Sequence, residues 1–164
     1  MKEVYLGSIV NTHGIKGEVR ILSDFKYKDL VFIPGFKLYV GKTKEELVIR
    51  SYRKHKNFDM VTFEGIDDIN DVLGYKGESV YINRDDIVVD GYINEDIIGF
   101  DVYSNNNLIG NALEVINNGA HDILVIKGEH KKYMIPFIDK FIDNVDIENS
   151  KISINEIEGL LDEN

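Results

Sequence analysis

The sequence of 164 residues contains no cysteine. Without cysteine there is no disulfide and no thiolate metal site, and a reducing compartment is the natural environment. No apolar run approaches the roughly 18 residues that a membrane span needs. The first ten residues, MKEVYLGSIV, are too short and too polar a stretch for a signal peptide. We therefore expect a soluble, cytoplasmic protein with no membrane partner.

Positive charge is scarce in the second half of the chain. Residues 1–88 hold 14 Lys and Arg residues against 14 Asp and Glu, whereas residues 89–164 hold 5 against 15, so the whole net charge of −10 lies in the second half. Contact with phosphate needs cations, which this half lacks. The asymmetry indicates two surfaces with different partners. A solvated acidic face that only aids solubility is the alternative.

Several motifs of catalysis and metal binding are also missing. The sequence has neither a GxSxG nucleophile elbow nor a GxxxxGK[ST] phosphate loop. The spacing of two zinc ligands on one helix face, i and i+4, occurs nowhere among the four histidines His13, His55, His121 and His130. We predict no metal site and no cofactor.

Short segments of alternating polar and apolar residues dominate residues 1–88. Their period of two is typical of half-buried strands, and turn residues separate them. Six or seven such strands favour a small closed barrel. Residues 66–74 instead have apolar residues at helical spacing, acids in the first turn and a final glycine, which predicts one short helix. The expected strands are 4–6, 8–10, 18–22, 36–40, 46–50, 59–63 and 80–82.

The second half repeats this β character after an acidic junction at 85–96. We expect Pro136 at the edge or end of a strand, because proline cannot donate to a ladder. The fold class is therefore all-β, with domains at 1–88 and 95–164 and a linker at 89–94. The expected elements after the junction are strands 99–103, 108–110, 112–116, 122–126, 133–137 and 151–154, and a terminal helical turn at 156–161.

Residues 11–21, NTHGIKGEVRI, form a tight connection between two expected strands. Gly14 and Gly17 supply the positive φ or close backbone approach that such a turn needs. Spacing alone favours an ordinary hairpin with incidental charge. The functional alternative is a surface loop that offers His13, Lys16 and Arg20 to a phosphate backbone.

A second cluster strengthens the functional alternative. Residues 50–56, RSYRKHK, carry four cations and a tyrosine and no acid. Phosphate contact and aromatic stacking would let this run bind RNA. An exposed hairpin end kept soluble by its charges is the other interpretation. The candidate cations and the histidine of this run are Arg53, Lys54, His55 and Lys56.

Three stretches together resemble one family. The stretch LGSIVNTHGIKGEVRILSDF resembles the N-terminal signature of the RimM ribosome maturation factors, and RSYRKHKNFDMVTFEGIDDINDVLGYKGESVYINR is similar to the segment that follows it. The second half, with DIIGFDVY, IGNALEVINNGAHDILVIKG and MIPFIDKFIDNVDIENSKISI, resembles the PRC-barrel domain of that family. The resemblance covers nearly the whole chain.

The resemblance implies two small β-barrels, the first six-stranded and antiparallel, and a monomeric assembly factor that is not an enzyme. It implies action on the head of the 30S subunit, the 3′ domain of 16S rRNA, through binding of immature subunits and of the nineteenth small-subunit ribosomal protein. The expected ribosome-binding residues are His13, Gly14, Lys16, Gly17, Arg20, Arg53, Lys54, His55 and Lys56.

The contacts expected for the ribosomal protein are Tyr92, Asp96 and Phe100. The family often has two adjacent tyrosines where this chain has Tyr92 and Ile93. Two other classes of protein stay open. One is a small β-barrel enzyme acting on RNA or a nucleotide, with His13 as general base; the other is a generic PRC-type interaction module.

Overall fold

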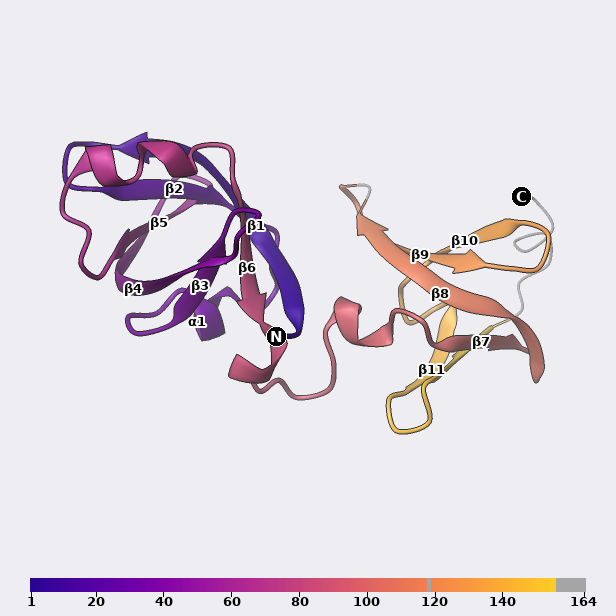
Figure 1. The fold of residues 1–164 in the computed structure, drawn as a ribbon. Helices are drawn as coiled ribbons and strands as arrows, with labels where there is room; N and C mark the ends of the chain where they lie inside the picture. The colour runs from indigo at the N-terminus through magenta and orange to yellow at the C-terminus, as the bar shows by residue number, and fades with distance from the viewer. Residues whose placement is uncertain (118, 156–164) are drawn as a thin grey trace. The chain divides into compact units, whose positions relative to one another are not determined.

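The computed structural model describes residues 1–117 and 119–155, and it divides the chain into two compact units (Figure 1). The first unit is Met1–Val88 and the second is Val89–Asn164. In the described part of the chain, no helix combines the length and the apolarity required to cross a membrane.

The first unit is a closed six-stranded barrel. Its strands follow one another around the barrel in the order β1-β2-β5-β4-β3-β6, and every neighbouring pair is antiparallel. Closure removes the free edges that a small open sheet would expose. The strands are β1 (Glu3–His13), β2 (Glu18–Leu22), β3 (Lys37–Val40), β4 (Glu45–His55), β5 (Phe58–Phe63) and β6 (Ser79–Asn83).

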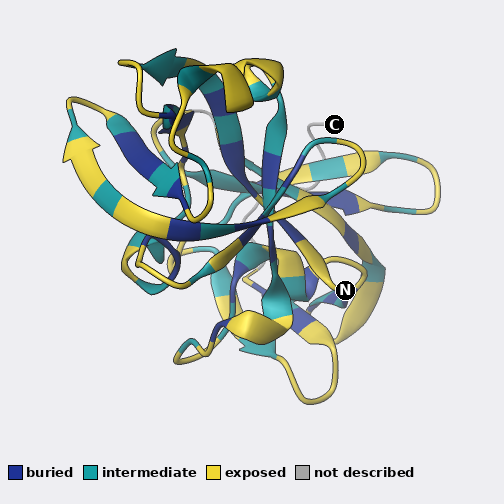
Figure 2. Cartoon of the chain, turned by 60° about the vertical axis from the view of Figure 1, so that its left-hand side comes forward, coloured by how far each residue is buried: buried dark blue, intermediate teal, exposed yellow. Residues whose placement is uncertain are grey.

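The interior of the barrel is filled by every second side chain of its strands. In β2 the apolar Val19 and Ile21 are fully buried, and Arg20 between them faces outward. Figure 2 shows bands of buried and less buried residues alternating along the strands of the chain. Because successive side chains of a strand point to opposite faces, this pattern fixes which face of β2 lines the core. The outward position of Arg20 follows directly from this alternation.

Strand β1 is longer than the sequence predicts, because Gly7 does not end it. The pairing of β1 with β6 shifts register between Tyr5 and Gly7, so the glycine sits at a β-bulge inside one continuous strand. A Cβ atom at Gly7 would overlap the carbonyl oxygen of Leu22. Only glycine allows this approach, which explains the break in the apolar pattern.

The helical content of the first unit differs in detail from the prediction. The segment 66–74, predicted to form one short helix, contains two 3-10 helices, η1 (Ile69–Asp71) and η2 (Leu73–Tyr75). The α-helix of this unit, which is described throughout, is instead α1 (Lys28–Val31). A third 3-10 helix, η3 (Arg84–Asp86), follows β6.

The second unit is a six-stranded sheet in the order β10-β9-β8-β7-β12-β11. Strands β7 and β12 are parallel, and all other neighbours are antiparallel. The 3-10 helix η4 (Asn94–Ile97) precedes the sheet, and Ile97 packs into its core. The strands are β7 (Asp101–Ser104), β8 (Asn107–Asn117), β9 (Asp122–Lys127), β10 (Lys132–Pro136), β11 (Ile142–Asp146) and β12 (Lys151–Ile154).

The prediction of an all-β protein built from two β units with one short helix is confirmed. Pro136 is the last residue of β10, which lies at one end of the sheet order. The helical turn predicted at 156–161 lies outside the described residues. The linker at 89–94 stays a prediction; within it, Ile93 is only 4% exposed.

Candidate functional site

Six outward side chains on neighbouring strands of the first unit form what we call the polar face. Strand order places β2 beside β5 and β5 beside β4, and the register aligns Arg20, Met60 and Arg53 in one row. Met60 is fully buried although it alternates with the core residue Val61, so the polar face covers it. The members of the face are His13, Glu18, Arg20, Arg53, His55 and Phe58.

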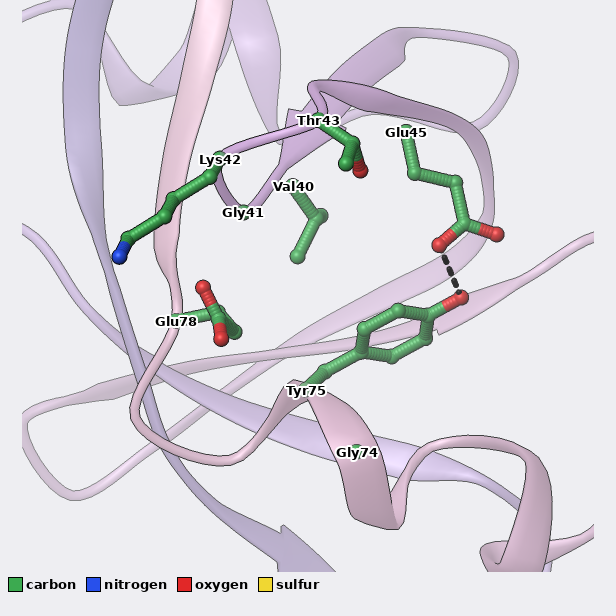
Figure 3. Close-up of a pocket in the computed structure, with 8 residues that line it drawn as sticks. All are labelled: Val40, Gly41, Lys42, Thr43, Glu45, Gly74, Tyr75 and Glu78. Atoms are coloured by element: carbon green, nitrogen blue, oxygen red, sulfur yellow. Dashed lines mark hydrogen bonds between the residues drawn. The ribbon is translucent and has the colours of Figure 1, made fainter.

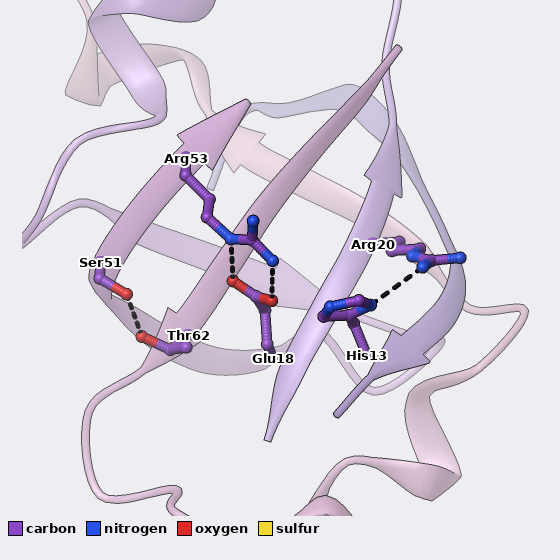
Figure 4. Close-up of polar contacts among 6 residues, drawn as sticks. All are labelled: His13, Glu18, Arg20, Ser51, Arg53 and Thr62. Carbon is purple, nitrogen blue, oxygen red and sulfur yellow. Dashed lines mark hydrogen bonds and ion pairs between the residues drawn. The ribbon is translucent and has the colours of Figure 1, made fainter. Parts of the chain in front are cut away.

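Arg53 and Glu18 form a bidentate ion pair on this face (Figure 4). Arg53 donates from Nε to Glu18 Oε2 at 2.9 Å and from Nη2 to Oε1 at 2.8 Å. The hydrogen bond from Arg53 lowers the pKa of the Glu18 carboxyl, against the opposing effect of burial. Arg53 was predicted to meet phosphate, but its guanidinium already has a carboxylate partner.

Arg20 has a different environment. Its Nη2 donates to Nδ1 of His13 at 2.9 Å, as Figure 4 shows, and its guanidinium lies 5.7 Å from the centroid of the Phe58 ring. The Nε donor of Arg20 is buried and has no hydrogen-bond partner in the described structure. Arginine only donates, so Nδ1 of His13 accepts. The proton of the neutral imidazole is therefore on Nε2.

The two histidines of the face meet although they come from distant segments of the sequence. The ring centroids of His13 and His55 are 6.2 Å apart, and the ring planes are inclined by 39°. The two residues belong to separate sequence motifs, residues 11–21 and residues 50–56. The barrel brings these motifs together through β1 and β4, which flank β2 and β5.

The predicted lysines are not brought together. Lys16 is in the turn before β2 and Lys56 is in the turn before β5. Because β2 and β5 are antiparallel, these two turns lie at opposite ends of the face. Lys54 alternates away from Arg53 and His55 along β4. All three lysines are exposed, and none has an ion-pair partner among the described residues.

The predicted turn glycines have the expected backbone. Gly14 has φ +67° and Gly17 has φ +91°, values that favour glycine. Gly17 is also packed closely, since a Cβ atom there would meet Ile66 and the backbone of Asp68. The carbonyl of Ile15 accepts a hydrogen bond from the backbone N–H of Ile69 at 3.0 Å. These contacts fix the turn against the segment before η1.

In the second unit, the three predicted contact residues have different surroundings. Tyr92 is half-buried and its ring centroid lies 6.5 Å from that of Phe137. Asp96 accepts a hydrogen bond from the backbone N–H of Ile93 at 2.9 Å. Phe100 is only 8% exposed and belongs to the core. Its ring therefore offers little surface to a partner, because it packs against the other core residues.

The first unit contains a buried acid that the sequence pattern did not indicate. Asp59 is fully buried, and its carboxylate pairs with Lys28 of α1 at 2.8 Å. It also accepts a hydrogen bond from the Tyr52 hydroxyl at 2.7 Å. Burial and this hydrogen bond raise the pKa of Tyr52 to about 12. These contacts join α1 to the barrel, and the carboxylate of Asp59 is buried away from solvent.

A shallow pocket of about 250 Å³ lies beside the turn between β3 and β4 (Figure 3). The Tyr75 hydroxyl donates to Glu45 across it at 2.9 Å, and Glu78 also lines it. Burial and this hydrogen bond raise the pKa of Tyr75 to about 12. No histidine and none of the predicted site residues line the pocket.

The described residues include no group of three His, Asp or Glu side chains placed to hold a metal ion. The arrangement on the polar face is instead one of cations, aromatic rings and fixed hydrogen-bond donors. Such a set is suited to binding an anionic or base-bearing partner.

A closed barrel that carries the polar face, followed by a second β unit, defines a two-unit all-β protein. Comparison with known proteins makes this specific. Residues 4–87 match the model of the RimM N-terminal domain, and residues 94–160 match that of the RimM PRC barrel domain. The chain belongs to the RimM family, as its motifs predicted.

Relatives match this chain over almost its whole length. The ribosome maturation factor RimM of Staphylococcus haemolyticus is 46% identical, with 98% of this chain and 99% of the relative covered. The protein of the same name from Staphylococcus aureus strain JH9 is 44% identical, with 97% and 99% covered. The solution structure of the N-terminal domain of RimM from Thermus thermophilus covers 54% of this chain and 98% of its own, at 17% identity and a TM-score of 0.47.

Proposed function

We propose that this protein is a non-enzymatic factor in the maturation of the small ribosomal subunit, acting in the cytoplasm as a monomer. Its relatives along nearly the full chain are named ribosome maturation factors. The proposed step is assembly of the head of the 30S subunit, the 3′ domain of 16S rRNA. The observation that carries the proposal is the polar face with its neighbouring lysines.

The first unit is the proposed rRNA-binding part. Positive charge is concentrated there, and phosphate contacts from Lys and Arg dominate the affinity of nucleic-acid binding. Arg20, Lys16, Lys54 and Lys56 have no carboxylate partner among the residues described, unlike Arg53. We therefore assign the phosphate contacts to these four residues, and assign to Arg53 a role in holding β4 and β2 together.

The second unit is the proposed protein-binding part, and its partner is the nineteenth small-subunit ribosomal protein. Residues 89–164 carry the net charge of −10. A cation-rich ribosomal protein would be steered to such a surface by complementary charge. Tyr92 and Asp96 are its candidate contacts, since Phe100 is committed to the core.

The tautomer of His13 supports a binding role over catalysis. A general base needs an unprotonated ring nitrogen that faces the substrate. In His13 the unprotonated nitrogen is Nδ1, and Arg20 occupies it. Protonation there would place an N–H against a guanidinium and would cost the hydrogen bond. The enzyme alternative, with His13 as base, has no support from this arrangement.

Sucrose-gradient co-sedimentation tests the proposed function. Immature small subunits should carry the protein into the gradient, and mature subunits under the same conditions should carry much less. Equal association with both, or with neither, would contradict the proposal. Cleavage of precursor 16S rRNA by the purified protein, abolished by His13→Gln, would show that it is an enzyme.

A further inference from the structure

The polar face contains one arginine whose charge has no carboxylate partner. Arg53 pairs with Glu18, and Arg50 on the same strand pairs with Asp67 at 2.6 Å. In the part of the chain that the structure describes, Arg20 has no carboxylate partner; it hydrogen-bonds to the His13 imidazole and lies beside the Phe58 ring. Arg20 is also half-buried, so water screens its charge less than that of an exposed side chain.

Arg20 also has unused hydrogen-bonding capacity. A guanidinium carries five N–H donors in a planar fork, and one of them, on Nη2, is used by His13. The donor on Nε is buried and unpaired in the described structure. The fork matches the geometry of phosphate oxygens, which accept two parallel hydrogen bonds. An external oxyanion would meet the charge of Arg20 and the remaining donors on its terminal nitrogens, because the buried Nε is out of a partner's reach.

Aromatic rings lie beside this cation. The imidazole of His55 is 6.2 Å from that of His13, and both rings are half-buried on the outer side of the barrel. Flat rings next to an unpaired arginine are the arrangement on which a base can stack while its phosphate meets a cation. Lys16 and Lys56 at the two ends of the face extend the positive charge along it.

We propose that the polar face binds an unpaired RNA strand, with Arg20 taking a phosphate and the His55 ring stacking on a base. The inference rests on the proposed function and names the form of RNA that the first unit takes. A base within a duplex is stacked on both sides and has no free face for a side chain, whereas an unpaired base exposes one. His13 is a positioning residue, since its Nδ1 holds the guanidinium of Arg20.

Binding of labelled RNA to the full-length protein tests this inference. The probes are an unstructured oligouridine of about 12 nucleotides and an RNA duplex of the same length, titrated at about 50 and 200 mM salt. The oligouridine should bind at least about tenfold more tightly than the duplex. Equal or tighter binding of the duplex, or no measurable binding of oligouridine, would overturn the proposal.

Two matched pairs of variants locate the contact. Arg20→Gln and Arg50→Gln remove the same charge from the same barrel; the first should weaken oligouridine binding about tenfold and reduce the salt slope by about 0.7, and the second should change neither. His55→Ala should weaken binding about fivefold or more, while His55→Tyr restores it because tyrosine also stacks. His130→Ala, at an exposed histidine of the second unit, should have no effect.

Equal effects of Arg20→Gln and Arg50→Gln, or an unchanged affinity of His55→Ala, would refute the assignment of residues. Circular dichroism of each variant confirms that it is folded. Co-sedimentation with immature subunits separates the two claims. If the wild-type protein associates with them but does not prefer single strands, this inference fails and the proposed function stands; if it does not associate, the proposed function fails.

Discussion

Glu18 on β2 and Arg53 on β4 are joined by two hydrogen bonds that pass across the intervening strand β5. The pair connects the turn motif of residues 11–21 to the basic run of residues 50–56. It also removes one cation from the set available to a partner. The charge that the polar face offers is therefore smaller and more localised than the composition of the basic run indicates.

Acid should weaken this connection. The pKa of Glu18 is lowered below its ordinary value of 4.5 in the folded protein, so the pair stabilises the fold above that pH. The stabilisation is lost as the pH falls through the lowered value. Urea unfolding of wild type and Glu18→Gln should therefore differ at pH 7 and converge once the pH lies below the lowered pKa of Glu18. Glu64→Gln, at an exposed glutamate with no ion-pair partner among the described residues, controls for loss of a carboxylate, and a difference that persists in acid would contradict the prediction.

Removal of the two terminal lysines should act additively. Lys16 and Lys56 lie in turns at opposite ends of the polar face, so they share no partner. We expect Lys16→Gln and Lys56→Gln each to reduce the slope of log K against log salt by about 0.7 for single-stranded RNA. The double variant should show the sum, as measured by fluorescence anisotropy. Lys42→Gln, in the turn between β3 and β4, serves as the control and should leave the slope unchanged.

Alkaline titration should separate two tyrosines from the rest. The pKa values of Tyr52 and Tyr75 are both raised to about 12, above the ordinary 10.0. Asp59→Asn removes the charge beside Tyr52, so its ionisation should move down part of the way, because burial still raises it. Tyr75, which bonds to Glu45, should not move. Phenolate absorbance measures both, and a simultaneous shift of both would contradict the prediction.

The same raised values affect stability at high pH. A tyrosine that ionises later in the folded state stabilises the fold fully below the unfolded pKa of about 10. That contribution is lost as the pH rises towards about 12. Denaturant midpoints of the wild-type protein should fall over this interval. The fall should be smaller in Asp59→Asn, relative to its own midpoint at about pH 8.

Substitution of Gly7 should cost more than substitution of Gly74. A Cβ atom at Gly7 would overlap the carbonyl oxygen of Leu22, whereas at Gly74 it would meet nothing within 4 Å. We expect Gly7→Ala to lower the free energy of unfolding by about 1–3 kcal/mol, with Gly74→Ala close to neutral. Chemical denaturation measures both. Equal effects would mean that the bulge in β1 relaxes around the added methyl group.

Ile93 should contribute to the stability of the protein. Its side chain is 4% exposed, and its backbone N–H donates to Asp96. Ile93→Ala should therefore cost about 2–4 kcal/mol, and Ile93→Val about 1 kcal/mol. Thermal unfolding of the full-length variants measures the difference. Ile93→Tyr, the residue expected from the family motif, should also destabilise, because a larger ring overpacks a buried site.

The strands that alternation predicted are the ones whose buried residues repeat every second position, such as β2 with Val19 and Ile21. Strand β11, Ile142–Asp146, was not predicted. Two acids and an asparagine in five residues hide its period, and only pairing with β12 makes it a strand. In β1, the sequence predicted two strands separated at Gly7. A glycine between apolar residues can mark a β-bulge inside one strand as well as a turn between two strands.

The sequence indicated the individual residues of the polar face, but it did not indicate how they lie relative to one another. His13 and Arg20 were chosen from one motif and His55 from another, and all three lie on the polar face. The basic run has no acid of its own, yet Glu18 and Asp67 reach its two arginines from elsewhere in the chain. Knowing this requires the strand order, which depends on long-range pairing that no local pattern encodes.

The parallel pairing of β7 with β12 means that the two units can complete folding at different times during synthesis. All six strands of the first unit are complete once Asn83 has been added, so that barrel can close early. Strand β7 begins the second sheet at Asp101, but its parallel neighbour ends at Ile154. The second unit therefore cannot be completed before Ile154 has been added, and a ribosome that stalls between these positions would hold a folded first unit on a tether with an unfinished sheet.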